Sequence, residues 1–517
     1  MIIEELFSRI SRNLGLIPTS EQSAAMQLFS HFVLGMPVAE TDRFPTSTEA
    51  AAYPLRRAAL PSVMILRGSA GTGKTTLASA FVKTLSELGH KIILLAPTGR
   101  AAKVFALNSG HDAFTIHRKI YLQQSMDASG GQFSLNYNKH TDTLFMVDEA
   151  SMIANDGFEH AFGSGRLLDD LIQFVFSGKR CRLLLIGDKA QLPPVGESHS
   201  PALSADVLRQ YGLEVVESDL NEVVRQHQES GILWNATAIR QIIQHDQLTE
   251  MPKIKFQGFA DIVMVPGGEL IETLASSYSY VGLDETMVIT RSNKRANIYN
   301  QGIRNQVLGR EEYLDTGDML MIVKNNYYWL KDTEKDAQTV QAGTQPTQTE
   351  EADDSNSHVP SFLANGDIAV VKSVRNSREL YGFNFVDVWL SLPDYDDYEL
   401  QATLLIDTLS SEAPALSREQ SEQLYNKVME DYADIPNKRE RLKQLKSDIH
   451  FNAVQVKFAY AVTCHKAQGG QWAHVYIDQG YMTDEMLSSD YVHWLYTAFT
   501  RATEKLFLVN WPTSQTL

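Results

Sequence analysis

The feature that most constrains this chain is a glycine-rich octapeptide, Gly68-Ser69-Ala70-Gly71-Thr72-Gly73-Lys74-Thr75. It follows the apolar run Val63–Arg67 and precedes a helical pattern over Thr75–Leu88, which is the context that a P-loop requires. Glycines let the backbone N–H groups of such a loop, together with that of Thr76, turn toward phosphate oxygens. Lys74 is then expected to reach the β- and γ-phosphates, and the Thr75 hydroxyl to ligate Mg²⁺. The segment predicts a nucleotide site in an α/β domain.

A second apolar run ends in two carboxylates. Leu144–Val147 reads as a strand and is followed by Asp148 and Glu149. In the same sheet as a P-loop, Asp148 is expected to hold the Mg²⁺ shell, and Glu149 to orient or deprotonate the attacking water. We therefore expect ATP and Mg²⁺ as cofactors, although a kinase, a transporter ATPase or a GTPase would show the same two features.

Short apolar runs alternate with helical patterns along the first part of the chain, which predicts a parallel sheet covered by helices on both faces. The strands expected there are Val63–Arg67, Lys91–Ala96, Leu144–Val147 and Arg182–Ile186, with Arg100–Leu107 as a further helix. A second α/β unit is expected from Asp261–Val265, Thr286–Thr290, Val475–Ile477 and Leu506–Asn510.

A β-rich insert interrupts the second unit, with strands expected at Met319–Val323, Asp367–Val374, Phe385–Leu390 and Leu400–Ile406. Lys331–Ser361 is rich in Thr, Gln, Asp, Glu and Ser, and this composition predicts a mobile loop. Ser417–Ser447 is charged and predicts two solvated helices that break at Pro436. The expected division is 1–60 as a helical lead-in, 61–215 as the first domain, 216–318 and 451–517 as the second, and 319–450 as the insert.

Composition limits the cellular environment and the binding partners that are expected for the protein. Two cysteines with no metal-ligand spacing fit a reducing, cytoplasmic environment, and no apolar run is long enough to span a membrane. The formal net charge of −17 argues against a protein that coats nucleic acid, but a local basic channel remains compatible with it.

The segment Gly187–Gly196, with the sequence GDKAQLPPVG, resembles motif III of superfamily 1 helicases. By this resemblance Gln191 lies near the γ-phosphate and reports its presence to the DNA site. Other segments resemble the remaining motifs in the order of the family. Gln22 resembles the adenine-reading glutamine, and Arg225 and Arg501, in the segments that resemble motifs IV and VI, are implied to reach the γ-phosphate from the second domain. The residues implied to contact the DNA backbone are Pro97, Thr98, Gly99, Arg100, Thr115, His117, Thr463, His465, Lys466 and Gln468.

The RecD/Dda branch is the nearest resemblance, from motifs III, V and VI and from Asn365-Gly366-Asp367-Ile368. It implies two tandem RecA-like domains, an SH3-like insert, and an ATP-driven motor that moves 5′ to 3′ on single-stranded DNA and opens fork or tailed duplex. Repair or replication proteins are possible partners. Two alternatives stay open: a DNA-stimulated ATPase that remodels protein–DNA complexes without unwinding, and an RNA-directed helicase.

The region Tyr121–His140 predicts a β-hairpin, with Gly130-Gly131 as its turn and an alternating strand at Gln132–Tyr137. By resemblance this hairpin separates the strands, through Phe133 or Tyr137. The alternative is that both aromatic rings only pack the hairpin against the first domain.

Overall fold

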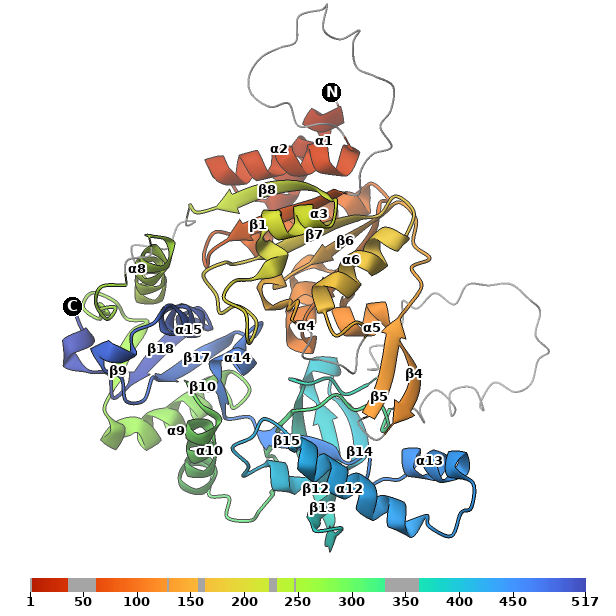
Figure 1. The fold of residues 1–517 in the computed structure, drawn as a ribbon. Coiled ribbons are helices and arrows are strands. Elements are labelled where there is room, and N and C mark those ends of the chain that lie inside the picture. Colours follow the sequence, from red (N-terminus) through yellow and green to blue (C-terminus); the bar gives the residue numbers. More distant parts are fainter. Residues whose placement is uncertain are drawn as a thin grey trace, which may run out of the picture.

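The computed structural model describes residues 2–35, 62–127, 130–156, 163–222, 230–245, 248–330 and 362–517. Arg225 and the expected loop Lys331–Ser361 lie outside them. The α/β class with two sheets, a hairpin insert and a β-rich insert is confirmed (Figure 1). None of the helices in the described ranges is long and apolar enough to cross a bilayer.

The first domain is built on six parallel strands in the order β3-β2-β6-β7-β1-β8. Side chains of β1 alternate between two cores: Val63 and Ile65 pack on one face, and Met64 and Leu66 on the other. Helices therefore cover both faces of the sheet. The strands are β1 (Ser62–Gly68), β2 (Lys91–Ala96), β3 (Ala113–Thr115), β6 (Thr143–Val147), β7 (Arg182–Gly187) and β8 (Glu214–Leu220); the helices are α1 (Ile2–Leu14), α2 (Ser20–Leu34), α3 (Lys74–Glu87), α4 (Gly99–Ser109), α5 (Ile116–Ile120), α6 (Leu167–Ser177) and α7 (Ala205–Gln210).

The second domain has five parallel strands in the order β16-β10-β17-β18-β9. Its core is continuous with that of the insert, because buried residues of both belong to one apolar cluster. The strands are β9 (Ile262–Val265), β10 (Thr286–Thr290), β16 (Ala461–Thr463), β17 (Trp472–Asp478) and β18 (Ala502–Val509); the helices are α8 (Gly231–His245), α9 (Leu270–Tyr280), α10 (Asn293–Gly302), α14 (Cys464–Ala467) and α15 (Ser489–Phe499).

The insert is a closed five-stranded barrel made of β11 (Met319–Ile322), β12 (Ile368–Leu380), β13 (Phe383–Leu392), β14 (Tyr398–Leu405) and β15 (Val454–Phe458). The expected boundary at residue 450 leaves out β15, which closes the barrel by pairing with β11 and β14. Between β14 and β15 lies the expected helical hairpin, α12 (Arg418–Asp431) and α13 (Lys438–Lys446), which packs on the barrel through its own small core.

Three strands of the two parallel sheets were absent from the sequence prediction. β3 and β16 have three residues each, too few to show a period. β8 is an edge strand with three acidic residues among seven, and it carries the first domain beyond residue 215. A strand at the edge buries less, so its sequence shows a weaker apolar signal.

The hairpin forms from β4 (Tyr121–Asp127) and β5 (Gly130–Leu135). The prediction of its turn was wrong in detail, because Gly130 pairs with Asp127 and Gly131 with Met126. Both glycines are therefore strand residues, and the connection precedes them.

Candidate nucleotide and DNA site

The P-loop joins β1 to α3 in a conformation that only its glycines allow. Gly71 and Gly73 both have φ of 78°, in the left-handed region. A Cβ on Gly68 would lie 2.7 Å from Thr72 Oγ1 and 2.8 Å from Lys74 Cγ, so the loop could not close on a larger residue. Lys74 Nζ lies inside the loop and donates to the Ser69 carbonyl at 3.1 Å. This geometry fits a loop that wraps a phosphate chain.

The two carboxylates follow β6, two strands away from the P-loop strand in the same sheet. Glu149 has φ of 51°, a left-handed conformation that is strained for a non-glycine residue, and its N–H donates to Asp148 Oδ1 at 2.9 Å. Burial and the negative charge of Glu149 raise the pKa of Asp148 to about 7, against the opposing effect of Lys74. A cation beside Asp148 would restore its ionised form.

The donor set suits Mg²⁺. Thr75 is the second residue of α3 and Asp148 directly follows β6, so a hydroxyl and a carboxylate are available from two elements of one sheet edge. Mg²⁺ prefers oxygen ligands and keeps several waters when phosphates supply the rest of its shell.

Gln191 connects Glu149 of the first domain to an arginine of the second. It is buried on the segment after β7, and with its amide oriented to satisfy both neighbours, its nitrogen donates to Glu149 Oε2 at 3.3 Å. Its oxygen accepts from Arg501 Nη2 at 3.2 Å. Arg501 is 2% exposed and also donates to the carbonyls of Thr497 and Gly470, so its guanidinium is fixed at the cleft. Glu149, Gln191 and Arg501 thus form one chain of contacts between the domains.

The expected DNA contacts lie along the same edge of the sheets as the nucleotide site. Thr98 follows β2 and caps α4 by accepting from the Ala101 N–H at 3.2 Å; Thr115 ends β3 and caps α5 by accepting from the Arg118 N–H at 3.2 Å. Thr463 ends β16 and precedes α14 in the second domain. Helix N-termini present N–H groups that suit phosphate oxygens. The carboxyl edge of the first sheet therefore has two parts. The residues expected to bind nucleotide follow β1, β6 and β7, and the residues expected to bind DNA follow β2 and β3.

Comparison with known proteins gives two family matches, one in the first domain and its continuation and one in the C-terminal part of the second domain. Residues 55–259 match an AAA domain, and residues 458–509 match a UvrD-like helicase C-terminal domain. The ATP-dependent RecD2 DNA helicase of Deinococcus radiodurans is 33% identical over 137 residues, which is 26% of this chain. Both matches agree with the resemblance of the motifs to superfamily 1 helicases of the RecD branch.

Two further comparisons cover most of the chain at low identity. An uncharacterized protein, R530 of Acanthamoeba polyphaga mimivirus, is 22% identical over 515 residues, covering 86% of this chain and 94% of the relative. A solved structure titled for DNA unwinding at forked duplex by two coordinating Pif1 helicases is 16% identical, with a TM-score of 0.44, and covers 97% of this chain and 94% of that one. The matched segment is only 16% of the RecD2 chain.

A buried arginine of the second domain, to which the sequence analysis did not point, contacts the P-loop. Arg240, on α8 of the second domain, is 7% exposed, and its Nη1 donates to the Ser69 hydroxyl and, at 3.5 Å, to the Asn221 carbonyl. Its Nε has no hydrogen-bond partner, and within the described ranges no carboxylate lies within 4.0 Å of its guanidinium. A buried cation without a counter-ion is costly, so this position favours an anion such as a nucleotide phosphate.

Tyr496 is another contact that sequence reasoning missed. It lies on α15 of the second domain, accepts from the Ala70 N–H of the P-loop at 3.0 Å and donates to Asp188 Oδ2 at 2.6 Å. Burial and the neighbouring Asp188 raise the pKa of Tyr496, so the phenol stays protonated and keeps its donor. The segment after β7 is thereby held by the second domain, which also binds it through Thr497, whose hydroxyl accepts from the Leu192 N–H at 2.8 Å.

The amide of Gln22, the expected adenine reader, is engaged inside the protein. Its oxygen accepts from the Thr19 N–H in a capping box at the start of α2, at 3.1 Å. Its nitrogen donates to the Thr72 carbonyl of the P-loop at 3.0 Å. Gln22 therefore lies beside the P-loop, and its amide keeps one N–H and one oxygen lone pair that these two bonds do not use.

Two expected DNA contacts have partners in the other domain instead. Gln468 is 7% exposed and donates to the Leu192 carbonyl at 2.7 Å, so its amide is used in the domain contact. Arg100 lies over the Trp472 ring at 4.4 Å and donates to the Gln471 carbonyl at 3.0 Å. Both side chains are paired across the domains in this structure, and their contact with the DNA backbone stays a prediction.

The remaining expected DNA residues differ in exposure. His465 is exposed on α14, and Lys466 Nζ donates to Asn365 Oδ1 of the barrel at 2.5 Å. His117 lies on α5, 5.7 Å from the Tyr121 ring. Pro97 and Gly99 flank the capping Thr98, and a Cβ on Gly99 would lie 2.5 Å from Asp367 Oδ1 of the barrel. The barrel thus touches the expected DNA segments of both domains.

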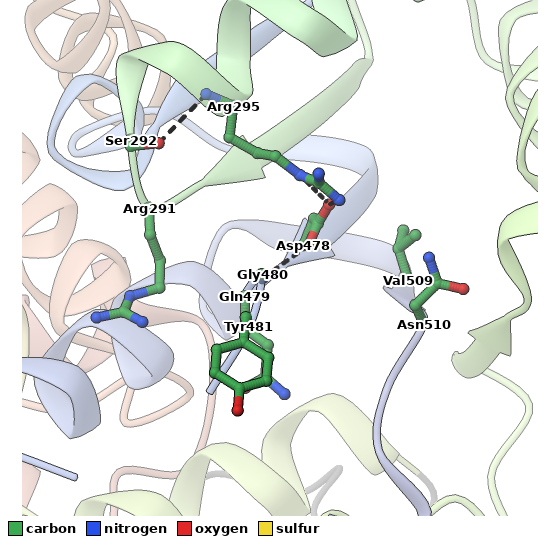
Figure 2. Close-up of a pocket in the computed structure, with 9 residues that line it drawn as sticks. All are labelled: Arg291, Ser292, Arg295, Asp478, Gln479, Gly480, Tyr481, Val509 and Asn510. Atoms are coloured by element: carbon green, nitrogen blue, oxygen red, sulfur yellow. Dashed lines mark hydrogen bonds and ion pairs between the residues drawn. The ribbon is translucent and has the colours of Figure 1, made fainter. Parts of the chain in front are cut away.

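A pocket of about 340 Å³ opens at the carboxyl edge of the second sheet (Figure 2). Arg295 pairs with the buried Asp478 at 2.6 Å, whereas Arg291 and the 83% exposed Tyr481 face outward. Thr290, just before Arg291, is in register with Thr463 of β16. Arg291 is therefore a cation on the expected DNA edge that the motif order alone did not reveal.

The two aromatic residues of the hairpin region differ in their surroundings. The Phe133 ring packs on Tyr327 of the barrel segment, with ring centroids 4.4 Å apart. Tyr137, just after β5, is 72% exposed. Phe133 therefore braces the hairpin on the barrel, and Tyr137 is the ring that a DNA base could reach.

Proposed function

We propose that this protein is a DNA helicase that hydrolyses ATP at the cleft between its two RecA-like domains and moves 5′ to 3′ on single-stranded DNA, opening duplex ahead of it. The observation that carries the proposal is the contact of Gln191 with both Glu149 and Arg501. One amide lies between the residue expected to position water and a cation of the other domain. Chemistry at the γ-phosphate therefore has a direct route to domain movement.

In this proposal the bound nucleotide holds the two domains together, because residues of both domains contact its phosphates. Lys74 and the loop N–H groups hold the phosphate chain from the first domain, and Arg501 and Arg240 approach from the second. Bound Mg²⁺, held by Thr75 and Asp148, would neutralise phosphate charge. Glu149 positions or deprotonates the water. Loss of the γ-phosphate removes the anion that both arginines share with Lys74, and the attraction between the domains falls.

The DNA residues convert this change into steps along a strand. Thr98 and Thr115 belong to the first domain and Thr463 to the second, so the two groups move relative to each other when the cleft opens or closes. Contacts of this kind go to phosphate and sugar and carry no base information. We therefore expect little sequence preference. The direction of movement and the opening of duplex rest on the resemblance to the RecD branch and on the hairpin.

Strand displacement with a matched ATPase assay tests this function. The wild-type protein should hydrolyse ATP faster with single-stranded DNA and release a labelled strand from a tailed duplex, and Lys74→Ala should do neither. DNA-stimulated hydrolysis without any strand release would favour the remodelling ATPase. Stimulation by single-stranded RNA but not by DNA would favour the RNA-directed helicase, because backbone contacts alone need not exclude either sugar.

A further inference from the structure

The helical hairpin on the barrel contains two helices with different arrangements of charge. α12 pairs its exposed charges internally, Arg418 with Glu422 at 2.9 Å and Lys427 with Glu430 at 3.2 Å. α13 carries five basic side chains and one acidic one. Within the described ranges, no carboxylate lies within 4.0 Å of a basic group of α13. The pairing in α12 is typical of a solvated helix, and α13 departs from it.

Three cations of α13 lie on one side of the helix. Arg439, Lys443 and Lys446 are spaced at i, i+4 and i+7, which places them in one stripe about 10 Å long. Leu445 is buried against the barrel, whereas Arg439 and Lys443 of the stripe are exposed to solvent. Lys443 and Lys446 lie in the last turn, where a cation interacts favourably with the helix dipole. Arg439 lies in the first turn, where the dipole does not favour a cation, and its like charge at i, i+4 from Lys443 destabilises the helix.

Two neighbouring tyrosines connect α13 to the hairpin β4–β5. Tyr328 donates its hydroxyl to the carbonyl of Ser447, the C-cap of α13, at 3.0 Å. The preceding residue, Tyr327, packs on Phe133 of the hairpin. Consecutive residues therefore hold the hairpin and the C-terminal end of α13, and Figure 1 shows the hairpin and α13 at the same side of the barrel.

We propose that the stripe on α13 binds the phosphate backbone of duplex DNA ahead of the hairpin. This inference rests on the proposed helicase function. A protein with a formal net charge of −17 repels DNA at long range. A row of cations without carboxylate partners beside the hairpin, with Arg439 and Lys443 exposed and Lys446 half-exposed, is where duplex phosphates would be attracted. The contact is electrostatic and independent of sequence, and it holds the duplex against the hairpin while the strand is pulled.

The test compares two double variants of the full chain that change net charge equally within one helical hairpin. Arg439→Glu with Lys443→Glu alters exposed residues of the stripe, and Arg418→Glu with Lys427→Glu alters exposed residues of α12. Binding of a 5′-tailed duplex and of the tail alone is measured by fluorescence anisotropy from about 50 to 200 mM salt. We expect the α13 variant to bind the tailed duplex about tenfold more weakly at low salt, with a salt slope smaller by about two.

The same variant should keep its affinity for the single-stranded tail and its DNA-stimulated ATP turnover within about twofold, and the α12 variant should match the wild type throughout. Equal weakening on the tail alone would overturn the assignment to duplex, and equal weakening in the α12 variant would show a general effect of net charge. Unchanged duplex binding in the α13 variant would also overturn the proposal and point to an acidic protein surface. These affinities do not require unwinding, so they remain informative if the wild type fails to displace a strand.

Discussion

Arg501 and Arg240 both reach the cleft from the second domain as buried guanidinium groups, but only Arg501 stands in a recognisable sequence pattern. Arg240 is one arginine of an amphipathic helix, where most arginines are solvated. Its role depends on α8 docking against the P-loop, and docking between domains leaves no local period or spacing in the sequence. The same holds for Tyr496, whose contact with Ala70 joins residues 426 positions apart.

Arg240→Ala is expected to lower ATP turnover at least tenfold, because a cation is removed from the phosphate side of the cleft. Arg240→Lys should recover part of the loss, since it keeps the charge but not the fork of donors. Gln241→Ala, the next and exposed residue of α8, is the control. Steady-state ATPase kinetics and a melting curve measure the effect. A lower melting temperature with unchanged turnover would assign Arg240 a structural role only.

Glu149→Gln is expected to bind ATP and fail to hydrolyse it, because Asp148 and Thr75 remain for Mg²⁺ while the base is lost. Lys74→Ala should lose turnover and keep single-strand binding, since Lys74 lies in the P-loop and the DNA residues lie on other strands. Nucleotide affinity, single-turnover hydrolysis and oligonucleotide binding separate the two variants. Loss of ATP binding in Glu149→Gln would contradict the role given to Glu149.

Among the elements, the barrel is the one whose contacts reach both sets of DNA residues. Its Asp367 lies against Gly99 at the start of α4, and its Asn365 accepts from Lys466 of α14. Asp367 is buried with Oδ1 unpartnered, while Oδ2 accepts from the Ala364 N–H at 2.7 Å and the Tyr395 hydroxyl at 3.1 Å. Burial and the nearby charge of Asp394 raise the pKa of Asp367 to about 7, against the opposing effect of the hydrogen bonds from Ala364 and Tyr395.

This carboxyl predicts a pH-dependent part of the stability. Because the folded pKa of Asp367 lies above the unfolded value of 3.8, the folded state binds the proton more tightly. The stabilisation is full at low pH and is lost as pH rises toward about 7. Asp367→Asn should lack this slope between about pH 4 and pH 7, and should melt above the wild type at pH 8. Melting temperatures across this range measure it, and parallel curves for the two proteins would contradict it.

The hairpin is the second element with a testable role. Opening one base-pair step costs roughly 1.4 kcal/mol, and stacking of a base on an aromatic ring returns ~1–3 kcal/mol. Replacing Gln124–Asn136 by a short Gly-Ser link is expected to keep single-strand-stimulated hydrolysis and to remove most unwinding. Tyr137→Ala should reproduce part of this loss through the exposed ring. Unwinding of the linked variant at the parent rate would place strand separation elsewhere.

At the scale of the whole molecule, local patterns were enough for the P-loop, the carboxylates after β6, the helical hairpin, and the strands of the two sheets other than β3, β8 and β16. Each has its own period or spacing within a short stretch. What the patterns could not give was the pairing of distant parts: β15 closing the barrel, Gln468 and Arg100 bonded across the domains, and Phe133 packed on Tyr327. These depend on how the domains and the barrel dock, which is set by surfaces far apart in the sequence.

The central claim is that the cleft between the domains drives movement in one direction along a strand. Two duplexes of identical sequence, one with a 5′ overhang and one with a 3′ overhang, test it most directly when strand release is followed with ATP and Mg²⁺, and with Glu149→Gln as the inactive control. The account predicts release from the 5′-tailed duplex and little from the 3′-tailed one. Release from the 3′-tailed duplex alone, or release that Glu149→Gln matches, would contradict it.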